Sequence, residues 1–332
     1  MQSHKLRSSE KYAPIIVSVY DRPHHFQKCI ESLSRNVDAE NTILFISSDG
    51  PTNTQESKDR VNQVREYLKS INGFKRVVSY CPRTNTNGAI KGTVFERVKS
   101  DFSTYIKTED DNIFAPYALK YFNQNLEIYK DDPSVHAVCG YMYPDFPYDQ
   151  KEQIFLKCFS FWGTAFWRDK DIYPEIDEIQ FINEIFQNKM LYTKINKTLP
   201  HLAPMMKAMV NGELQAGDVT RCAYMIKNEQ VSVFPSLSLV QNIGNDGTGL
   251  NCQTDESFAE QKITRGEITI SSRKPSFTDP KHASWLQRFF GGKKSIIRGQ
   301  LIWHEHSTTS VIVQKMIALV LLTGRKINRI IK

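Results

Sequence analysis

Cysteine is scarce in this chain, and long apolar runs are missing from it. The six cysteines among 332 residues form no C-x-x-C pair, which argues against a structural zinc site and a dense disulfide framework. No apolar segment follows Met1, and no uninterrupted apolar run reaches the roughly 18 residues of a membrane span. With 40% hydrophobic residues, the chain is long enough to bury a full core. We therefore expect a globular cytoplasmic protein without a visible secretion signal or a membrane-spanning helix.

Two glycine-rich nucleotide signatures are also missing. No G-x-G-x-x-G follows the first apolar segment, and no G-x-x-x-x-G-K-[ST] occurs. The sequence therefore supports neither a dinucleotide-dependent oxidoreductase nor a P-loop NTPase. A protein of this kind has to hold phosphate groups in another way. A divalent cation that bridges carboxylates and a diphosphate is one solution, because Mg²⁺ and Mn²⁺ accept oxygen ligands from both.

Positive charge is concentrated toward the end of the chain. The net charge is +7, and the residues from Lys281 onward carry ten Lys or Arg against the single acid Glu305. Residues 311–332 combine a short apolar run with basic side chains, which is typical of an amphipathic helix on an anionic membrane surface. A C-terminal helix packed on the body of the protein is the alternative, and both stay open. No nucleic-acid partner is expected, because no recognisable nucleic-acid-binding motif accompanies the charge.

Apolar and amphipathic segments alternate along the first 142 residues. Runs of β-branched residues that end in polar residues predict strands, and apolar residues at helical spacing predict helices. We expect strands within residues 13–23, 41–51, 75–82, 104–112 and 135–142, and helices within 24–36, 54–71, 92–100 and 117–130. This alternation predicts an α/β protein with a mainly parallel sheet covered by helices.

Acidic residues follow several of the predicted strands. In a parallel α/β sheet, ligands bind beyond the carboxyl ends of the strands, so these residues are candidates for a shared site. Three of them are adjacent, and neighbouring carboxylates repel each other and raise one another's pKa unless they are solvated or share a cation. An exposed acidic turn is the simpler interpretation of such a triplet. The residues at the strand ends are Asp21 and Arg22, Ser48 and Asp49, and Glu109, Asp110 and Asp111.

The strand ends, taken with their flanking segments, resemble the GT-A glycosyltransferases, and most of all the inverting N-acetylglucosaminyltransferase I type and its bacterial relatives. The resemblance depends on "PIIVSVYDRP", "ISSDG" and "TEDDNIFAPYALKYF", with later matches in "FSFWGTAFWRDKDIYPEI" and "PSLSLVQNIGNDGTG". It covers roughly residues 12 to 255 and is weakest between Glu175 and Gly217. It implies a GT-A domain over residues 12–255, followed by an extension over 256–332 that carries the basic helix.

The resemblance also implies roles for single residues. Asp111 takes the position of the family's direct ligand to Mn²⁺ or Mg²⁺, and Asp49 takes that of an acid that reads the base, usually uracil. A turn residue in "SSDGP" is the alternative for Asp49. The full set of candidates for binding the donor and its nucleotide is Asp21, Arg22, Asp49, Lys91, Glu109, Asp110 and Trp162.

The general base is harder to place by resemblance. The family's acid corresponds to "NGELQAGDVTRCAYM", where the match slides by one or two residues, so Asp218 is the candidate and Glu213 the reserve. Surface acids near a helix start are the alternative for both. Asn245 and Asp246 are expected in a loop near the site. His304 and His306 are either a late metal contact or structural residues.

The sequence therefore predicts a metal-dependent inverting glycosyltransferase that moves a sugar, with GlcNAc suggested by the resemblance, from a UDP-sugar to a glycan or lipid-linked acceptor. Its expected location is the cytoplasm, with peripheral contact at the inner membrane face if the basic helix binds lipid. A sugar-1-phosphate nucleotidyltransferase is the alternative enzyme, although "SVYDRPHHF" lacks the glycine-rich loop that normally follows the first strand of such enzymes. A carbohydrate- or membrane-binding protein that has kept the fold without the chemistry is the alternative outside the enzymes.

Overall fold

The computed structural model describes residues 11–144, 146, 152–172, 175–248, 260–275, 280–291, 295–297 and 300–302. The chain divides into two compact units, one formed by Met1–Tyr173 with Gln230–Phe277 and the other by Pro174–Glu229 with Thr278–Lys332. The predicted basic helix over 311–332 and the two histidines His304 and His306 lie outside the described residues. The predicted division into 12–255 and 256–332 stays a prediction.

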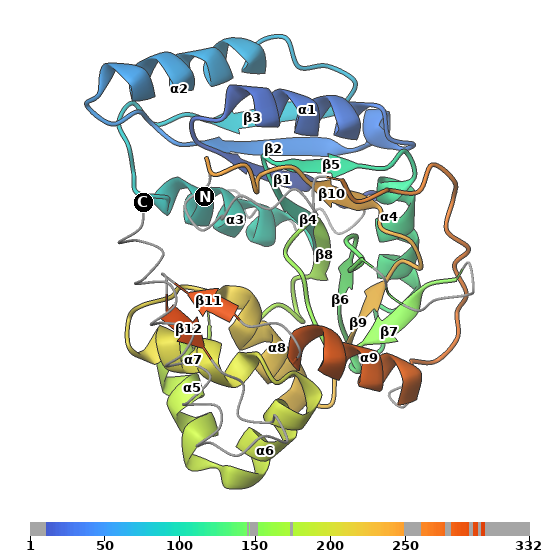
Figure 1. The fold of residues 1–332 in the computed structure, drawn as a ribbon. Helices are drawn as coiled ribbons and strands as arrows, with labels where there is room; N and C mark the ends of the chain where they lie inside the picture. The colour runs from blue at the N-terminus through green and yellow to red at the C-terminus, as the bar shows by residue number, and fades with distance from the viewer. Residues whose placement is uncertain are drawn as a thin grey trace, which may run out of the picture. The chain divides into compact units, whose positions relative to one another are not determined.

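A mostly parallel sheet forms the centre of the first unit (Figure 1). Its described strands are β1 (Ile15–Val19), β2 (Ile43–Ser48), β3 (Arg76–Tyr80), β4 (Thr104–Glu109), β6 (Val135–Cys139), β7 (Ile154–Leu156), β8 (Thr164–Trp167) and β9 (Val231–Phe234). They are arranged in the order β3-β2-β1-β4-β8-β6-β9-β7. Strand β8 pairs antiparallel with β4 and β6, and β7 pairs antiparallel with β9, while the other neighbours run parallel. The predicted α/β class is confirmed.

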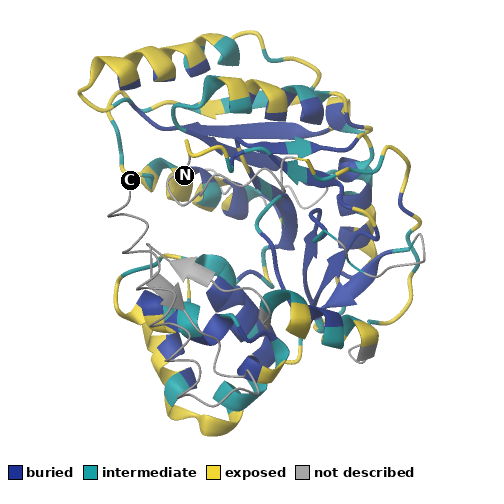
Figure 2. Cartoon of the chain, viewed as in Figure 1, coloured by how far each residue is buried: buried dark blue, intermediate teal, exposed yellow. Residues whose placement is uncertain are grey.

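Helices cover both faces of this sheet. They are α1 (Pro23–Ser34), α2 (Gln55–Leu68), α3 (Ala89–Asp101) and α4 (Ala118–Ile128), with a 3₁₀ turn, η1 (Ala39–Asn41). Figure 1 shows α1 and α2 on one side of the sheet and α3 on the other. Every residue of β1 is buried for this reason, so the strand is apolar at every position except Ser18 and does not alternate between apolar and polar residues. Figure 2 shows the same burial along the central strands.

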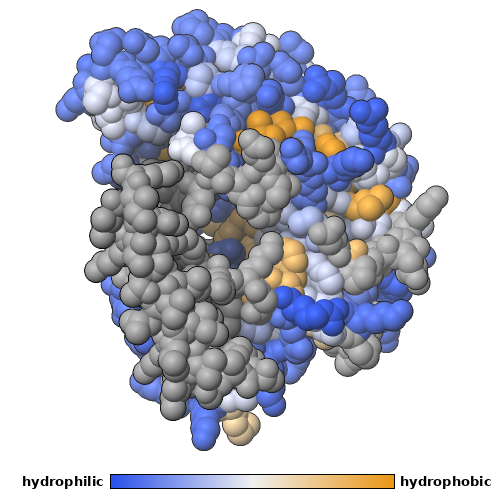
Figure 3. All heavy atoms as spheres, viewed as in Figure 1, coloured by the Kyte–Doolittle hydropathy of each residue, from blue (hydrophilic) through white to orange (hydrophobic). Residues whose placement is uncertain are grey.

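The packing of α1 explains why this segment folds as a helix. Its apolar residues Phe26, Ile30 and Leu33 repeat at helical spacing and are buried in the hydrophobic core of this unit, and each such side chain contributes roughly 1.5–3 kcal/mol when fully buried. Pro23 starts the helix, where its missing N–H costs no hydrogen bond. Helix α2 is different, because only Ser57, Val61 and Val64 are buried along it. Figure 3 accordingly shows a mainly hydrophilic surface over α2.

A separate two-stranded ribbon joins segments that are far apart in sequence. Strand β5 (Asn112–Phe114) pairs antiparallel with β10 (Val240–Asn242). Gly163 lies against this ribbon with a φ of +66°, and a Cβ atom there would approach Phe114 Cε1 to 2.8 Å and Val240 Cγ2 to 2.9 Å. Glycine is required at this position by both the backbone conformation and the lack of space. Because β5 follows β4 directly, its pairing with β10 positions the segment that comes after β4.

The second unit is mainly helical. It contains α5 (Glu178–Gln187), α6 (Lys189–Thr198), α7 (Leu202–Val210), α8 (Gly217–Lys227) and α9 (Pro280–Gly291), with β11 (Ser295–Ile297) paired to β12 (Gln300–Ile302). Asp177 and Asn188 cap the N-termini of α5 and α6 by accepting backbone N–H bonds of 3.0 Å, which satisfies donors that a helix start leaves free. Of the helices that the structure describes, none is both long and apolar enough to cross a membrane.

Candidate functional site

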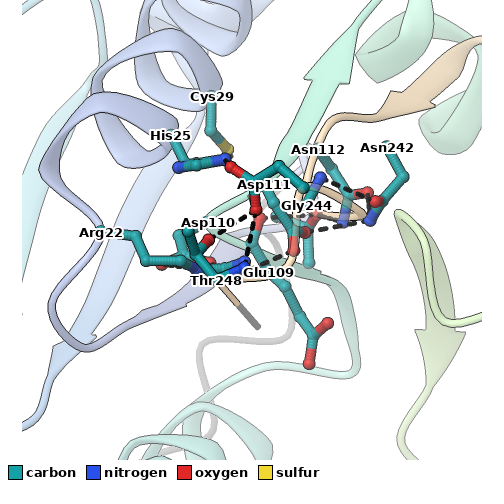
Figure 4. Close-up of polar contacts among 12 residues, drawn as sticks. Arg22, His25, Cys29, Glu109, Asp110, Asp111, Asn112, Asn242, Gly244 and Thr248 are labelled. Carbon is teal, nitrogen blue, oxygen red and sulfur yellow. Dashed lines mark hydrogen bonds and ion pairs between the residues drawn. The ribbon is translucent and has the colours of Figure 1, made fainter. Parts of the chain in front are cut away.

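The three adjacent acids at the end of β4 lie in different environments. Glu109 is exposed, and its carboxylate points away from its neighbours (Figure 4). Asp110 and Asp111 are each only 4% exposed. An exposed acidic turn therefore does not describe this segment, because two of its three carboxylates are withdrawn from water.

The guanidinium of Arg22 pairs with both buried carboxylates. Its Nη2 donates to Asp111 Oδ2 at 2.8 Å and also to Asp110 Oδ1, and its Nε donates to Asp110 Oδ2 at 3.4 Å. Burial works to lower the pKa of Arg22, but the two carboxylates raise it above its usual value. Arg22 is therefore a permanent positive charge between two acids. Its Nη1 is buried without a hydrogen-bond partner among the described residues.

Burial also changes the proton affinity of the carboxylates. It raises the pKa of Asp110 to about 7, against the lowering effect of Arg22 and with a further contribution from Asp111 and Glu109. Crowding by Asp111 and Glu109 acts in the same direction, but it is the smaller cause. The larger cause is withdrawal from water, which favours the neutral form of a carboxyl group.

The turn after β10 closes over Asp111. Asn242 Nδ2 donates to Asp111 Oδ1 at 3.1 Å and to Asn112 Oδ1 at 3.2 Å, and the backbone N–H of Ile243 donates to the carbonyl of Asp111 at 2.9 Å. A Cβ atom at Gly244 would lie 2.0 Å from Asp111 Oδ2. Only glycine leaves room for the carboxylate at this point.

The same loop contacts the start of α1. His25 Nε2 lies 3.1 Å from Asp246 Oδ2, and Asn245 Nδ2 donates to Asn242 Oδ1 at 3.1 Å. Burial, followed by the charge of Arg22, lowers the pKa of His25, while Asp246 opposes this effect. The expectation that Asn245 and Asp246 belong to a loop beside the acidic residues is confirmed. His25, Asn242 and Gly244 were missed as members of the site, although an Asn two residues before a glycine at the end of an apolar run was a signal.

Asp49 holds a neighbouring loop in place. Its carboxylate accepts hydrogen bonds from the N–H of Gly50 at 2.7 Å, the N–H and Oγ1 of Thr86 at 2.8 Å each, and the N–H of Gly88 at 2.9 Å. Burial works to raise the pKa of Asp49, but these hydrogen bonds lower it below its usual value. Asp49 is therefore an ionised residue that shapes the segment leading into α3. Its role in reading a base stays a prediction.

The other residues predicted to bind the donor form no described hydrogen bond or ion pair with Arg22, Asp110 or Asp111. Asp21 is half-buried after β1, and Lys91 is exposed in the first turn of α3. Trp162 is half-buried, with its ring centroid 4.6 Å from that of Tyr141, whereas the neighbouring Trp167 is a core residue that is 3% exposed.

Both candidates for the base belong to the second unit. Asp218 lies in the first turn of α8, and Glu213 lies between α7 and α8, within reach of Asn211 at 3.4 Å. The structure thus brings Arg22, Asp110 and Asp111 together. The roles of Asp218 and Glu213 stay predictions.

As they stand, the acidic residues do not fit a divalent cation. Such an ion needs direct oxygen ligands, usually six or more for Ca²⁺ and an octahedral set for Mg²⁺. Each of the four carboxylate oxygens of Asp110 and Asp111 already accepts a hydrogen bond from Arg22 or Asn242. Over the part of the chain that the structure describes, no group of three or more His, Cys, Asp or Glu side chains is arranged to hold a metal.

Comparison with known proteins adds little to this description. No family model matches the chain, and no curated protein matches its sequence. Among solved structures it is similar to S. aureus TarS, with 13% identity and a TM-score of 0.34 over 49% of this chain and 30% of that one. It is also similar to the fragment TarS 1–349, with 10% identity and a TM-score of 0.37 over 69% of this chain and 59% of that one.

A third similar structure is that of GalNAc-T7 with UDP, GalNAc and Mn²⁺. It is 11% identical, with a TM-score of 0.39 over 72% of this chain and 47% of that one. This chain thus spans less than two thirds of the length of each of the three. At such TM-scores and identities, the activity has to be inferred from the site's own residues.

Proposed function

We propose that the chain is a GT-A type glycosyltransferase that transfers a sugar from a UDP-sugar to an acceptor hydroxyl. The observation that carries the proposal is the buried cluster of Arg22, Asp110 and Asp111 at the carboxyl edge of the mostly parallel sheet. Ligands of such sheets bind at this edge. Buried charges are costly to maintain, which favours a role in ligand binding over a role in stability alone.

The chemistry that we propose makes two demands on the protein. Transfer breaks the bond between the anomeric carbon and a diphosphate oxygen and forms a bond from that carbon to the acceptor oxygen. Negative charge therefore develops on the leaving diphosphate, and the acceptor hydroxyl loses its proton to a base. Arg22 supplies positive charge at the carboxyl edge, with an unpaired Nη1 among the described residues, and Asp218 is the proposed base, with Glu213 as the reserve.

The finer parts of the proposal come from the resemblance of the sequence. They are inversion at the anomeric carbon, GlcNAc as the transferred sugar, dependence on Mn²⁺ or Mg²⁺, and a glycan or lipid-linked acceptor. Binding of the donor by Asp21, Asp49, Lys91, Glu109 and Trp162 has the same basis. We also propose a cytoplasmic location, with contact at the inner membrane face through the basic residues beyond 311.

A thermal-shift screen of nucleotide sugars, with and without Mn²⁺, tests the proposal. A ligand present at one hundred times its Kd stabilises the folded state by about 2.7 kcal/mol, so a UDP-sugar should raise the Tm of the wild type. Asp111→Asn should lose this rise. The matched control Asp59→Asn, which alters an exposed acid on α2 whose carboxylate accepts a hydrogen bond from Gln55, should keep it.

Product analysis completes the test. Release of UDP from the donor supports a transferase, and formation of a nucleoside diphosphate sugar and pyrophosphate from a nucleoside triphosphate and a sugar 1-phosphate would show a nucleotidyltransferase instead. If no nucleotide sugar raises the Tm and none is consumed, the glycosyltransferase proposal is wrong.

A further inference from the structure

We propose that the β3 edge, residues 75–83, binds an extended acidic segment of a partner protein, which joins the sheet as a further strand. Strand β3 lies at one end of the strand order, and β2 and β1 separate it from β4 and the acidic residues that follow β4. Binding at this edge needs neither a nucleotide nor a metal ion. It is therefore independent of the proposed transfer of a sugar.

Strand β3 is the least buried strand of the sheet. None of its five residues is buried: Arg76 and Ser79 are exposed, and Val77, Val78 and Tyr80 are half-buried. Each of the other described strands of this sheet contains buried residues. Of the described strands, only β2 pairs with β3. The backbone N–H and C=O groups that point away from β2 are therefore a template for pairing with another chain.

The opposite edge of the sheet is covered by the chain itself. Strand β7 has three residues, all buried, and a later segment of the chain holds the two residues before it. Glu152 forms a β-bridge with Thr269, and Gln153 exchanges hydrogen bonds with Ser271. A short strand and a covering segment both protect an edge from other chains. No described segment forms such a bridge with β3, so the fold protects one edge and leaves the other accessible.

Positive charge surrounds β3, and no acid accompanies it. Between Tyr67 and Phe95 the chain contains no Asp or Glu, but it contains Lys69, Lys75, Arg76, Arg83 and Lys91. Arg76 begins the strand, and Arg83 follows three residues after its end. Both arginines are exposed, and neither forms a hydrogen bond or ion pair with another described residue. The two ends of the β3 edge therefore each present a cation that a partner can pair with.

This charge selects the kind of partner. Two copies of this chain that paired through their β3 edges would bring two basic segments together, and like charges on neighbouring strands are destabilising. An extended segment with acids near its two ends would instead place opposite charge beside Arg76 and Arg83. Apolar residues between those acids would contact Val77 and Val78. Backbone hydrogen bonds supply the affinity in this mode of binding, and the side chains supply the specificity.

Fluorescence polarisation of a labelled synthetic peptide, titrated with the full chain, tests the surface. The peptide carries glutamates at both ends and alternates valine and threonine between them, and it matches the β3 edge in length. It should bind, and salt should weaken the binding because the paired charges are exposed. One control peptide has glutamine in place of each glutamate, and another has N-methylated amides in its middle. Both should bind more weakly by a factor of about ten or more.

A pair of double variants tests the arginines. Arg76→Gln combined with Arg83→Gln should weaken binding of the acidic peptide by a factor of roughly 5 to 30. The matched control combines Arg60→Gln with Arg97→Gln, which removes the same charge from α2 and α3, where each arginine is paired with an acid of its own helix. The control should bind the peptide as the wild type does. Circular dichroism establishes that both variants are folded, and the comparison of peptides needs no variant.

Hydrogen exchange locates the contact, because amides of β3 that pair with the peptide should exchange more slowly. Three results would overturn the proposal: no binding of the acidic peptide, binding that is unchanged in Arg76→Gln with Arg83→Gln, or bound peptide without slower exchange in β3. Analytical ultracentrifugation of the full chain alone covers the other occupant. Self-association that slows exchange in β3 would assign this edge to a second copy of the chain and would also refute the proposal.

Discussion

Replacement of Gly244 by alanine is the sharpest test of how the site is built. A Cβ atom at this position would lie 2.0 Å from Oδ2, 2.7 Å from Cγ and 2.9 Å from Cβ of Asp111. All three atoms belong to one side chain that is 5% exposed, so it has little space to move into. The closest contact must lengthen to at least about 3.4 Å, which is ordinary van der Waals distance. Either Asp111 or the loop that carries Gly244 has to shift.

The expected loss of stability follows from the contacts that such a shift breaks. Overpacking of a filled site costs typically 1–3 kcal/mol. Displacement of Asp111 also weakens its hydrogen bonds to Arg22 at 2.8 Å and to Asn242 at 3.1 Å, and a buried group left unpaired costs about 1–3 kcal/mol. We therefore expect Gly244→Ala to lower the free energy of unfolding by roughly 2–6 kcal/mol and to weaken UDP-sugar binding.

The matched control is Gly92→Ala. Gly92 lies inside α3, and its Cβ would meet no atom within 4 Å. Alanine in a helix interior is favoured over glycine by roughly 0.5–1 kcal/mol, so the same chemical change should stabilise the protein there. Denaturant midpoints followed by circular dichroism compare the two variants. Equal midpoints for Gly244→Ala and the wild type would show that the loop does not pack on Asp111, and the geometry of the site would then be wrong.

Three further changes test the acids separately. The folded pKa of Asp110, about 7, exceeds the unfolded value of about 3.9, so its contribution to stability is complete below about pH 4 and is lost as the pH rises through 7. Asp110→Asn should reduce the difference between the free energies of unfolding measured in urea at pH 5 and at pH 8. A difference equal to that of the wild type would contradict the raised pKa of Asp110. Asp49→Asn should speed amide exchange at Thr86 and Gly88 and raise the donor KM more than it lowers kcat. A wild-type KM would remove Asp49 from the donor site. Asp218→Asn should lower the rate of sugar transfer by a factor of roughly 10² to 10⁴. Its affinity for UDP, measured by calorimetry, should be unchanged. Loss of UDP affinity in the folded variant would refute its assignment as the base.

Local sequence pattern was sufficient to predict several strands of the sheet, but not β7, β8 and β9, which are buried at every residue. Strands β1, β2, β4 and β6 all fall within predicted ranges, because a continuous β-branched run bounded by polar residues has few alternatives. The pairing of β5 with β10 was not predictable in this way. Each strand has three residues, and the pair is defined by contacts between Asn112 and Asn242, which are 130 residues apart.

In the site, too, residues marked by local sequence pattern were predicted, and contacts between residues far apart in sequence were not. Asp110 and Asp111 were found because acids at the end of a parallel strand lie where ligands bind. Their burial and their pairing with Arg22 were not predicted, because an ion pair between residues 88 or 89 positions apart leaves no trace in the local pattern. Arg22 was assigned to the nucleotide, a role that no contact in the structure tests. Gly244 could be recognised only once Asp111 lay beside it.

The ion cluster itself argues that this edge of the sheet binds something. A buried ion pair contributes little to stability compared with apolar residues of the same volume, because desolvation offsets most of the Coulombic attraction. Apolar side chains could replace the ion cluster, because the neighbouring Cys29 of α1 is already fully buried next to Glu109. Stability alone therefore does not explain a guanidinium and two carboxylates at this point. A charged ligand explains them, because groups already withdrawn from water need little further desolvation when that ligand arrives. The same reasoning separates an active site from a fold that has lost its chemistry: a protein without a charged ligand would gain stability by exchanging the cluster for apolar residues.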